Sequence, residues 1–240
     1  MKAYIGTCGY FYWDWKGKFY PNELKPHQWF SFYAKHFDTL EINSTFYKFP
    51  TPSSLTAWYK KAPKDFIFSL KVNKTITHIK RFKDTKEELN RFYMLSAKYL
   101  KEKLGIFLFQ LPPSFRYSPQ NLELIVNQID PTFKNCIEFR HESWFREETF
   151  SMLKTKNIIF CCISTPKFGD ICKNTANMVY VRLHGKTQWY KYRYTTDELV
   201  QWADKIKSIN PTEAFIYFNN TYNAYAVENA LLMKKIINQV

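Results

Sequence analysis

Three pairs of polar residues, spaced two apart, stand at the ends of otherwise apolar runs: Glu41 and Asn43, Glu138 and Arg140, and Arg182 and His184. Because side chains alternate between the two faces of a β-strand, the members of each pair face the same side. A lone charge is very costly to bury in an apolar surrounding, so these charges should pair with one another. The sequence therefore predicts a polar network built from several strand ends.

The glutamates of this network have two roles open to them. Glu41 and Glu138 are of the type that serves as general acid and base on a sugar or a phosphate ester, and His184 could move protons beside them. Both could equally be supports for the arginines, because structural ion pairs perturb carboxylates as readily as catalysis does. The catalytic candidates are Glu41, Glu138 and His184.

Cations outnumber carboxylates among these strand-end residues. Lys71, Arg140 and Arg182 stand against two glutamates, and the excess positive charge suits an anionic ligand that a guanidinium can grip with two bonds. Tyrosines after the first two strands could stack a ring of the ligand or form a hydrophobic lid. The predicted ligand-binding residues are Tyr10, Asn43, Tyr47, Lys71, Gln110, Arg140, Arg182 and Asn219.

The composition gives little support to metal or phosphate-loop chemistry. The chain has five histidines, and two of them, His27 and His36, fall in a predicted helix, which leaves too few ligands for a multi-metal centre. A single divalent ion on Glu41, Glu138 and His184 would lack a carboxylate from a third strand. Six glycines argue against a glycine-rich phosphate loop. We expect no cofactor and no metal site.

The elements that must position these residues are short apolar runs rich in β-branched and aromatic residues. Runs without clean alternation are typical of strands buried on both faces, as in a parallel sheet. We predict eight such strands, over residues 3–8, 39–43, 66–72, 105–110, 135–140, 158–163, 179–184 and 214–218. Helical spacing and cap signals predict helices between most of them, over residues 26–36, 53–61, 86–101, 118–128, 146–155, 196–207 and 226–240.

Alternating strands and helices are the pattern of βαβ units, and eight of them favour an α/β fold closed into a single (β/α)8 TIM-type barrel over residues 1–240. The segment between Ile163 and Val179 contains Pro166, Gly169 and Asp170, which is too broken for a full crossover helix. We therefore expect the sixth helix to be short or missing. In such barrels the active site lies at the carboxyl ends of the strands.

Long ordered motifs give the chain a resemblance to a known family. They are GTCGY (6–10), FYP (19–21), FDTLEINSTFY (37–47), FQLPPSF (109–115), EFRH (138–141), RLHG (182–185) and FNNT (218–221). Together they resemble the YecE-like family, a domain of unknown function, over nearly the whole chain. The resemblance implies a TIM-type barrel and no particular reaction. Two positions depart from the family pattern: Cys8 stands where serine is common, and Ser164 follows the sixth strand where an acidic residue is expected.

The bulk composition bears on partners and compartment. A net charge of +14 raises the prospect of a polyanionic partner, although a generally basic composition explains it equally well. No signal peptide and no long apolar run are visible, which predicts a cytoplasmic protein without membrane contact. Five cysteines without metal spacing are expected to be buried, reduced thiols. A monomer is favoured.

Basic residues with interleaved aromatics follow the third and seventh strands, over residues 71–83 and 186–193, and could form a nucleic-acid approach surface or a solvated face.

The leading hypothesis is a cationic strand-end pocket for a phosphate-bearing or nucleic-acid-like anion, with hydrolysis as one activity. One alternative is a non-catalytic binding or regulatory protein. Another is a sugar isomerase or lyase, which predicts metal dependence.

Overall fold

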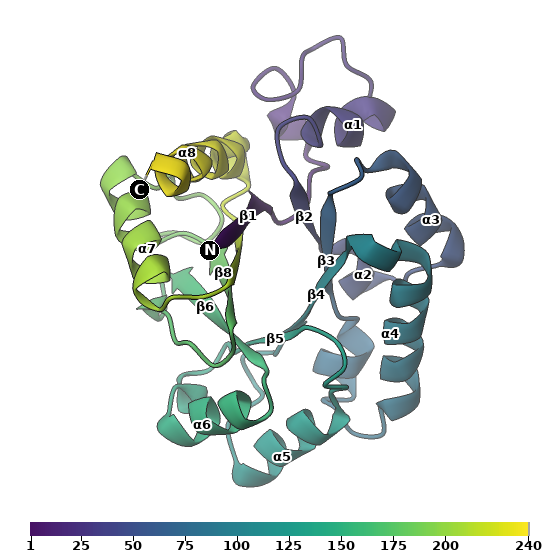
Figure 1. Ribbon diagram of the computed structural model, residues 1–240, viewed down its shortest axis with the longest axis vertical. Helices are drawn as coiled ribbons and strands as arrows, with labels where there is room; N and C mark the ends of the chain where they lie inside the picture. Colours follow the sequence, from purple (N-terminus) through teal and green to yellow (C-terminus); the bar gives the residue numbers. More distant parts are fainter. Residues whose placement is uncertain (240) are drawn as a thin grey trace.

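The computed structural model describes residues 1–239, and its centre is a barrel of eight parallel strands (Figure 1). The strands pair in the order β1-β9-β8-β6-β5-β4-β3-β2. This confirms the predicted α/β barrel of TIM type. The barrel strands are β1 (Lys2–Thr7), β2 (Thr39–Ile42), β3 (Ile67–Lys71), β4 (Leu104–Gln110), β5 (Asn135–Glu138), β6 (Ile159–Thr165), β8 (Met178–Leu183) and β9 (Glu213–Phe218).

Helices pack around the outside of the barrel (Figure 1). The capping signals act as expected: the side chain of Ser118 accepts from the amide of Asn121, and Thr195 forms a capping box with Glu198. The helices are α1 (Trp29–Tyr33), α2 (Ser44–Tyr47), α3 (Pro52–Lys61), α4 (Lys86–Leu100), α5 (Pro119–Gln128), α6 (Glu147–Thr155), α7 (Thr196–Ser208) and α8 (Tyr225–Gln239).

Two differences from the predicted helices lie near the barrel mouth. In place of one helix over residues 26–36, the chain forms a 3-10 turn over Pro26–Gln28 and a short α-helix over Trp29–Tyr33. The loop after β3 contains a short π-helix, Thr75–Ile79, which apolar spacing does not reveal. Residue 240, the end of the last predicted helix, lies outside the described residues.

The crossover after β6 has no helix among the described residues, as the sequence predicts. In its place the chain turns at Gly169, whose φ of +68° suits a residue without a side chain, and returns as β7 (Gly169–Ile171). β7 pairs antiparallel with β6, with Ile163 opposite Ile171. A hairpin therefore covers this side of the barrel.

The hairpin overturns part of the cysteine prediction. Cys162 and Cys172 form a disulfide, with their Cα atoms 4.3 Å apart. The physical reason is the antiparallel register of β6 and β7, which pairs Ile163 with Ile171 and, continued by one residue beyond β7, brings Cys162 opposite Cys172. Cys8, Cys136 and Cys161 are buried and free, in line with the expectation for those three.

Loss of the disulfide should lower stability measurably. The bond closes a loop of 10 residues, and restricting the unfolded chain over that length stabilises a protein by about 2–3 kcal/mol. For a chain of this size we expect a melting temperature lower by about 5–10 °C. Calorimetry should show this drop for Cys172→Ser, and for the parent in dithiothreitol. Added reductant should leave Cys172→Ser unchanged, and a parent insensitive to reductant would contradict the assignment.

The barrel is joined unevenly around its circumference. β1 pairs with β9 along its whole length, from Lys2 opposite Glu213 to Thr7 opposite Phe218. Between β1 and β2 there is one isolated parallel bridge, Cys8 to Glu41, where the amide of Gly9 donates to the carbonyl of Glu41 at 2.9 Å. We call this β1–β2 contact the seam.

A tyrosine hydroxyl fills the rest of the seam. The Tyr33 hydroxyl accepts from the amide of Thr7 at 3.0 Å and donates to the carbonyl of Thr39 at 3.1 Å, so it links the two strands. Gly6 makes room for it, because a Cβ there would lie 2.4 Å from the Thr39 carbonyl oxygen and 2.9 Å from the tyrosine oxygen. Closure of the barrel thus depends on a glycine in β1.

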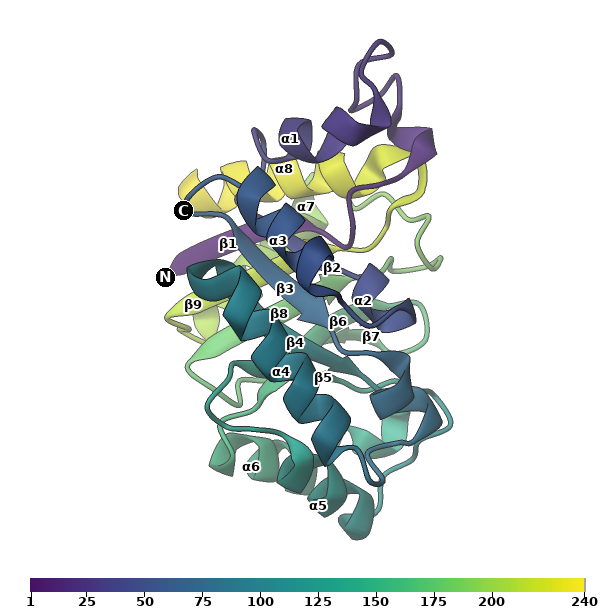
Figure 2. The ribbon, with the colours of Figure 1, turned by 90° about the vertical axis from the view of Figure 1, so that its right-hand side faces the viewer.

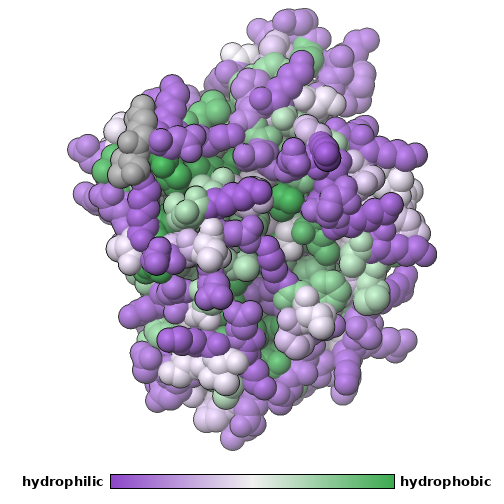
Figure 3. Space-filling view, in the orientation of Figure 1, coloured by the Kyte–Doolittle hydropathy of each residue, from purple (hydrophilic) through white to green (hydrophobic). Residues whose placement is uncertain are grey.

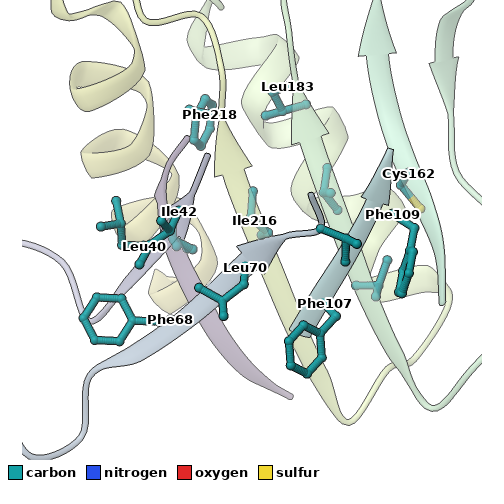
Figure 4. Close-up of a cluster of buried hydrophobic side chains, with 14 of the residues drawn as sticks. Leu40, Ile42, Phe68, Leu70, Phe107, Phe109, Cys162, Leu183, Ile216 and Phe218 are labelled. Carbon is teal, nitrogen blue, oxygen red and sulfur yellow. The ribbon is translucent and has the colours of Figure 1, made fainter. Parts of the chain in front are cut away.

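Strand alternation divides the buried side chains into two sets. The side chains that face the helices form the larger apolar cluster, part of which is drawn in Figure 4 with Leu40, Phe68 and Ile216 among the labelled residues. The second set fills the barrel interior and includes Ile106, Tyr180 and other members of a separate cluster. Because the period is two, the interior rows continue toward the carboxyl ends of the strands into the predicted polar residues.

The two ends of the barrel differ. In Figure 2 the strands run from the side of the two chain termini toward the side of α2 and β7, which is therefore the carboxyl end. Figure 3 shows the opposite, amino-terminal end, where hydrophilic residues cover most of the surface. No helix of the described residues is both long and apolar enough to cross a membrane.

Candidate functional site

Four charged or polar side chains from three strands meet inside the carboxyl end of the barrel. Arg182 is only 1 % exposed and lies between two fully buried carboxylates. Its Nη2 donates to Oε1 of Glu41 at 2.7 Å, and its Nη1 donates to Oε2 of Glu138. His184 Nε2 lies 3.1 Å from Oε1 of Glu138. We call Glu41, Glu138, Arg182 and His184 the buried ion cluster.

In the buried ion cluster, the ion pairs affect the pKa values of Glu138 and Arg182 more than burial does. Desolvation is the largest influence on Glu138 and raises its pKa, but the positive charges of Arg140 and Arg182 hold the pKa well below its usual range. Burial likewise lowers the pKa of Arg182, and the two glutamates raise it well above its usual value. Both groups therefore stay ionised across the physiological pH range.

The sequence analysis did not predict two further contacts of the buried ion cluster. The Tyr180 hydroxyl donates to Oε2 of Glu41 at 2.7 Å, and its own pKa is raised, first by burial and then by that carboxylate. Arg182 Nη2 also lies 3.6 Å from the sulfur of Cys8, the residue that departs from the family pattern. Period two could have revealed Tyr180, because it shares a strand face with Arg182 and His184.

His184 is a neutral member of the cluster. Burial, followed by the positive charge of Arg140, lowers its pKa to about 3. Its Nδ1 lies 2.9 Å from Nδ2 of Asn219, and its Nε2 faces the Glu138 carboxylate, which accepts but cannot donate. Nε2 also lies 3.2 Å from Nη2 of Arg140, a group that only donates, so Nε2 lies between an acceptor and a donor.

Arg140 connects the cluster to the surface. Its Nε forms an ion pair with Glu138 Oε1, and its side chain is 10 % exposed. The guanidinium lies over the ring of Trp189, 4.9 Å from the ring centre, in the loop after β8. Arg140 therefore has one side held by the cluster and another that faces the barrel mouth.

Lys71 lies beside the cluster without joining it. Its Nζ donates to Oε1 of Gln110 at 2.6 Å and lies 4.2 Å from the centre of the Phe46 ring. Among the described residues it forms no ion pair with a carboxylate, and it is 9 % exposed. Burial, and then the charge of Arg182, lower its pKa to about 8.

The structure therefore gathers eight of the predicted site residues at one place. They are Glu41, Lys71, Gln110, Glu138, Arg140, Arg182, His184 and Asn219. With His184 neutral, three cations face two carboxylates, and one positive charge is left in excess. Arg182 contacts both glutamates, so the excess charge lies on the side of Arg140 and Lys71, toward the mouth.

Three other predicted ligand-binding residues lie elsewhere. Tyr47 is on α2 and is 69 % exposed. Tyr10 and Asn43 line a separate cavity of about 300 Å³ between the loop after β1, β2 and α3, together with Leu40, Ile42, Trp58 and neighbouring residues. The backbone at Asn43 is helical and leads into α2, so Asn43 does not follow the alternation that the sequence prediction assumed for Glu41 and Asn43.

The two basic loops are partly neutralised by acidic residues of the helices that follow. Lys80 pairs with Glu88 of α4, Lys186 pairs with Glu198 of α7, and Arg193 pairs with Glu228 of α8. Such exposed pairs contribute little to stability, but they reduce the free positive charge. Other basic residues of these loops, such as Lys74 and Lys191, form no ion pair among the described residues, so the loops keep part of their positive charge in addition to the excess at the mouth.

Within residues 1–239, no three His, Cys, Asp or Glu side chains are grouped so that they could hold a metal ion. Both oxygens of Glu41 and both oxygens of Glu138 already contact side chains of the barrel. The sixth strand adds no carboxylate, because Ser164 and Thr165 end β6. What this donor set can hold is an anion, through ammonium, guanidinium and amide groups.

Fold and site together define a class: a TIM-like barrel with a buried ion cluster at the carboxyl ends of its strands. A family model described as "Protein of unknown function DUF72" matches residues 4–240. The chain therefore belongs to the DUF72 family, which confirms the YecE-like resemblance of its motifs.

Individual relatives agree with this assignment. The UPF0759 protein YunF of Bacillus subtilis is 27% identical over 98% of this chain and 94% of its own length. The UPF0759 protein YecE of Escherichia coli K12 is 28% identical over 47% of this chain and 42% of its own. A crystal structure of a DUF72 family protein from Thermotoga maritima matches with a TM-score of 0.89 and 32% identity, over 99% of this chain and 100% of that one.

Proposed function

We propose that this protein binds a phosphate-bearing anion at the carboxyl end of its barrel. The observation that supports this most strongly is Lys71, an ammonium group that is nine-tenths buried and has no carboxylate partner among the described residues. A buried charge without a counter-ion is unfavourable, and an anionic ligand would supply that counter-ion. Arg140 offers a second cation next to it, with a planar group suited to phosphate oxygens.

Neutral groups at the mouth fit the same ligand. Gln110 already holds the Lys71 amine through its oxygen, and its Nε2 makes a long contact of 3.3 Å to the carbonyl of Leu111. Asn219 is half-buried beside His184. Amide donors of this kind position a phosphate without adding charge.

For the two glutamates, we propose a supporting role. Glu41 is fully buried and holds Arg182 and Tyr180, while the lowered pKa of Glu138 leaves it without a proton to give as a general acid. Both would then fix the guanidinium groups that line the site. This favours ligand binding over acid–base hydrolysis by this pair, and it leaves the reaction, if there is one, to other groups.

Removing the Lys71 charge should weaken anion binding. A hydrogen bond to a charged group contributes about 1.5–3 kcal/mol, so Lys71→Met should lower affinity on the order of 10- to 100-fold. Titration calorimetry with inorganic phosphate and with AMP would measure this. Lys74→Met, which changes an exposed lysine three residues later, serves as the matched control and should bind like the parent. Equal affinity of parent and Lys71→Met would contradict the proposal.

The same titration should depend on pH. The pKa of Lys71 is about 8, so its ammonium loses a proton as the pH rises through that value, and affinity should fall between pH 7 and pH 9.5. AMP is the ligand for this pH series, because the second pKa of a phosphate monoester is near 6 and its charge is constant over this range. Nucleic acid would add a steep fall in affinity with salt, whereas a small ligand held by two cations would show a shallow one.

A further inference from the structure

Lys71 has a position that differs from that of every other buried lysine described here. It ends β3 at the barrel mouth, and its amine has one hydrogen-bond acceptor, the side-chain oxygen of Gln110. Lys103 is also buried, but its Nζ donates to the backbone carbonyls of Tyr59 and Ala62 at 2.9 and 2.8 Å. An ammonium has three N–H donors, so Lys71 is the less satisfied of the two.

The surroundings of Lys71 shift its protonation equilibrium toward the neutral amine, while the ammonium stays the main form at pH 7. The Phe46 ring covers one side, and the guanidinium groups of Arg182 and Arg140 repel a further positive charge. The carboxylates Glu41 and Glu138 oppose this effect, yet they are already bound to arginine. His78 faces the same region and is itself neutral near pH 7, because burial and then Lys71 lower its pKa to about 4.

A lysine that is desolvated and lies next to other cations is an activated nucleophile. With a pKa of about 8, it carries the free amine at pH 7 roughly 300-fold more often than an ordinary lysine. Arg140, one of the two cations that lower the pKa of Lys71, is also a group that would bind an anion. A ligand held by its phosphate would therefore bring its other end close to a reactive amine.

We propose that Lys71 forms an imine with an aldehyde or ketone group of a phosphate-bearing ligand. The ammonium of Lys71 gives up a proton, the amine nitrogen bonds to the carbonyl carbon, and the carbonyl oxygen leaves as water. The overall change is R–NH3⁺ + O=CR′2 → R–NH⁺=CR′2 + H2O, which needs no oxidant or reductant. The inference rests on the proposed anion site, because that site selects the phosphorylated carbonyl compound.

Reductive trapping tests this on the unaltered protein. Glyceraldehyde 3-phosphate is added at pH 7 with sodium cyanoborohydride, whose hydride converts an imine into a stable secondary amine, and peptide mass spectrometry then locates the label. We expect Lys71 to be labelled on the order of 100-fold faster than exposed Lys74 or buried Lys103. Labelling that follows surface exposure, with Lys71 at or below Lys74, would overturn the proposal.

A second probe separates this inference from the proposed function. Unphosphorylated glyceraldehyde should label Lys71 at least about 10-fold more slowly, since one ionic contact to phosphate is worth that much. Equal labelling by both probes would keep the imine and reject the anion site. Binding of inorganic phosphate without any label on Lys71 would keep the anion site and reject the imine. In Lys71→Arg, the label should vanish from this peptide, because a guanidinium does not form an imine.

Discussion

Replacing Arg182 by methionine should remove about 3–5 kcal/mol of stability, because it leaves two buried carboxylates without their shared cation. Glu41 would retain only the Tyr180 hydroxyl, and Glu138 would retain Arg140 and His184. Proteins of this size are stable by about 5–15 kcal/mol, so the loss is a large part of the total. Urea unfolding followed by circular dichroism would show a lower midpoint at unchanged slope.

Two further variants serve as controls for the Arg182→Met measurement. Arg193→Met breaks an exposed ion pair with Glu228 and should change stability by less than about 1 kcal/mol. Combining Arg182→Met with Glu41→Gln and Glu138→Gln removes the stranded charges and should recover part of the loss. If the triple variant is no more stable than Arg182→Met, the loss comes from packing and the electrostatic explanation is wrong.

Gly6→Ala should be nearly as severe, for a steric reason. The added Cβ would lie 2.4 Å from the carbonyl oxygen of Thr39, which is backbone and cannot move without opening the seam. Overpacking of this kind costs about 1–3 kcal/mol, and each lost hydrogen bond of Tyr33 adds about 1 kcal/mol. We expect a total of about 3–5 kcal/mol in urea unfolding.

Other glycines and Tyr33 provide controls for the seam. An added Cβ at Gly169 meets nothing within 4 Å, so Gly169→Ala should cost only the strain of its φ of +68°, about 1–2 kcal/mol. Tyr33→Phe keeps the ring and removes the bridging hydroxyl. Its loss of stability should lie between the losses caused by Gly169→Ala and Gly6→Ala. If Gly6→Ala is no worse than Gly169→Ala, the barrel does not depend on close contact between β1 and β2.

The barrel could be predicted from sequence because its strands are short apolar runs, and the segments between them have apolar residues at helical spacing. Helices α3 to α8 begin and end close to the predicted positions, and side-chain caps from Thr51, Ser118 and Thr195 mark the starts of α3, α5 and α7. The π-helix over Thr75–Ile79 and the β7 hairpin could not be predicted in this way. Both depend on contacts with neighbouring strands rather than on a local pattern.

The candidate site shows the same division. The alternation of side chains along a strand correctly predicted that Glu138 lies with Arg140, and Arg182 with His184, because those side chains continue rows of the barrel interior. It failed for Asn43, because the backbone at Asn43 is already helical, with φ of −92° and ψ of −17°, and leads into α2. Sequence also could not say which cation would remain unpaired. That depends on Arg182 contacting both glutamates, which leaves Lys71 with Gln110 alone.

These contacts also change which substitution can separate a binding protein from an enzyme. Glu138→Gln is the obvious choice from sequence, because it removes a candidate acid or base while keeping shape. In the structure Glu138 contacts Arg140, Arg182 and His184, so the variant would disturb three positioned groups at once. Lys71→Arg is the sharper substitution, since it keeps the charge and removes only the nucleophilic amine.

The uneven joining of the barrel has a consequence for how the chain folds as it is made. β1 emerges from the ribosome first, but the strand with which it pairs along its whole length, β9, ends at Phe218. At synthesis rates of ~5–20 residues per second, roughly 200 intervening residues take about 10–40 s. During that time β1 has only its short contact with β2 available, and its apolar residues stay exposed. The yield of folded protein should therefore depend on translation speed and on chaperone access.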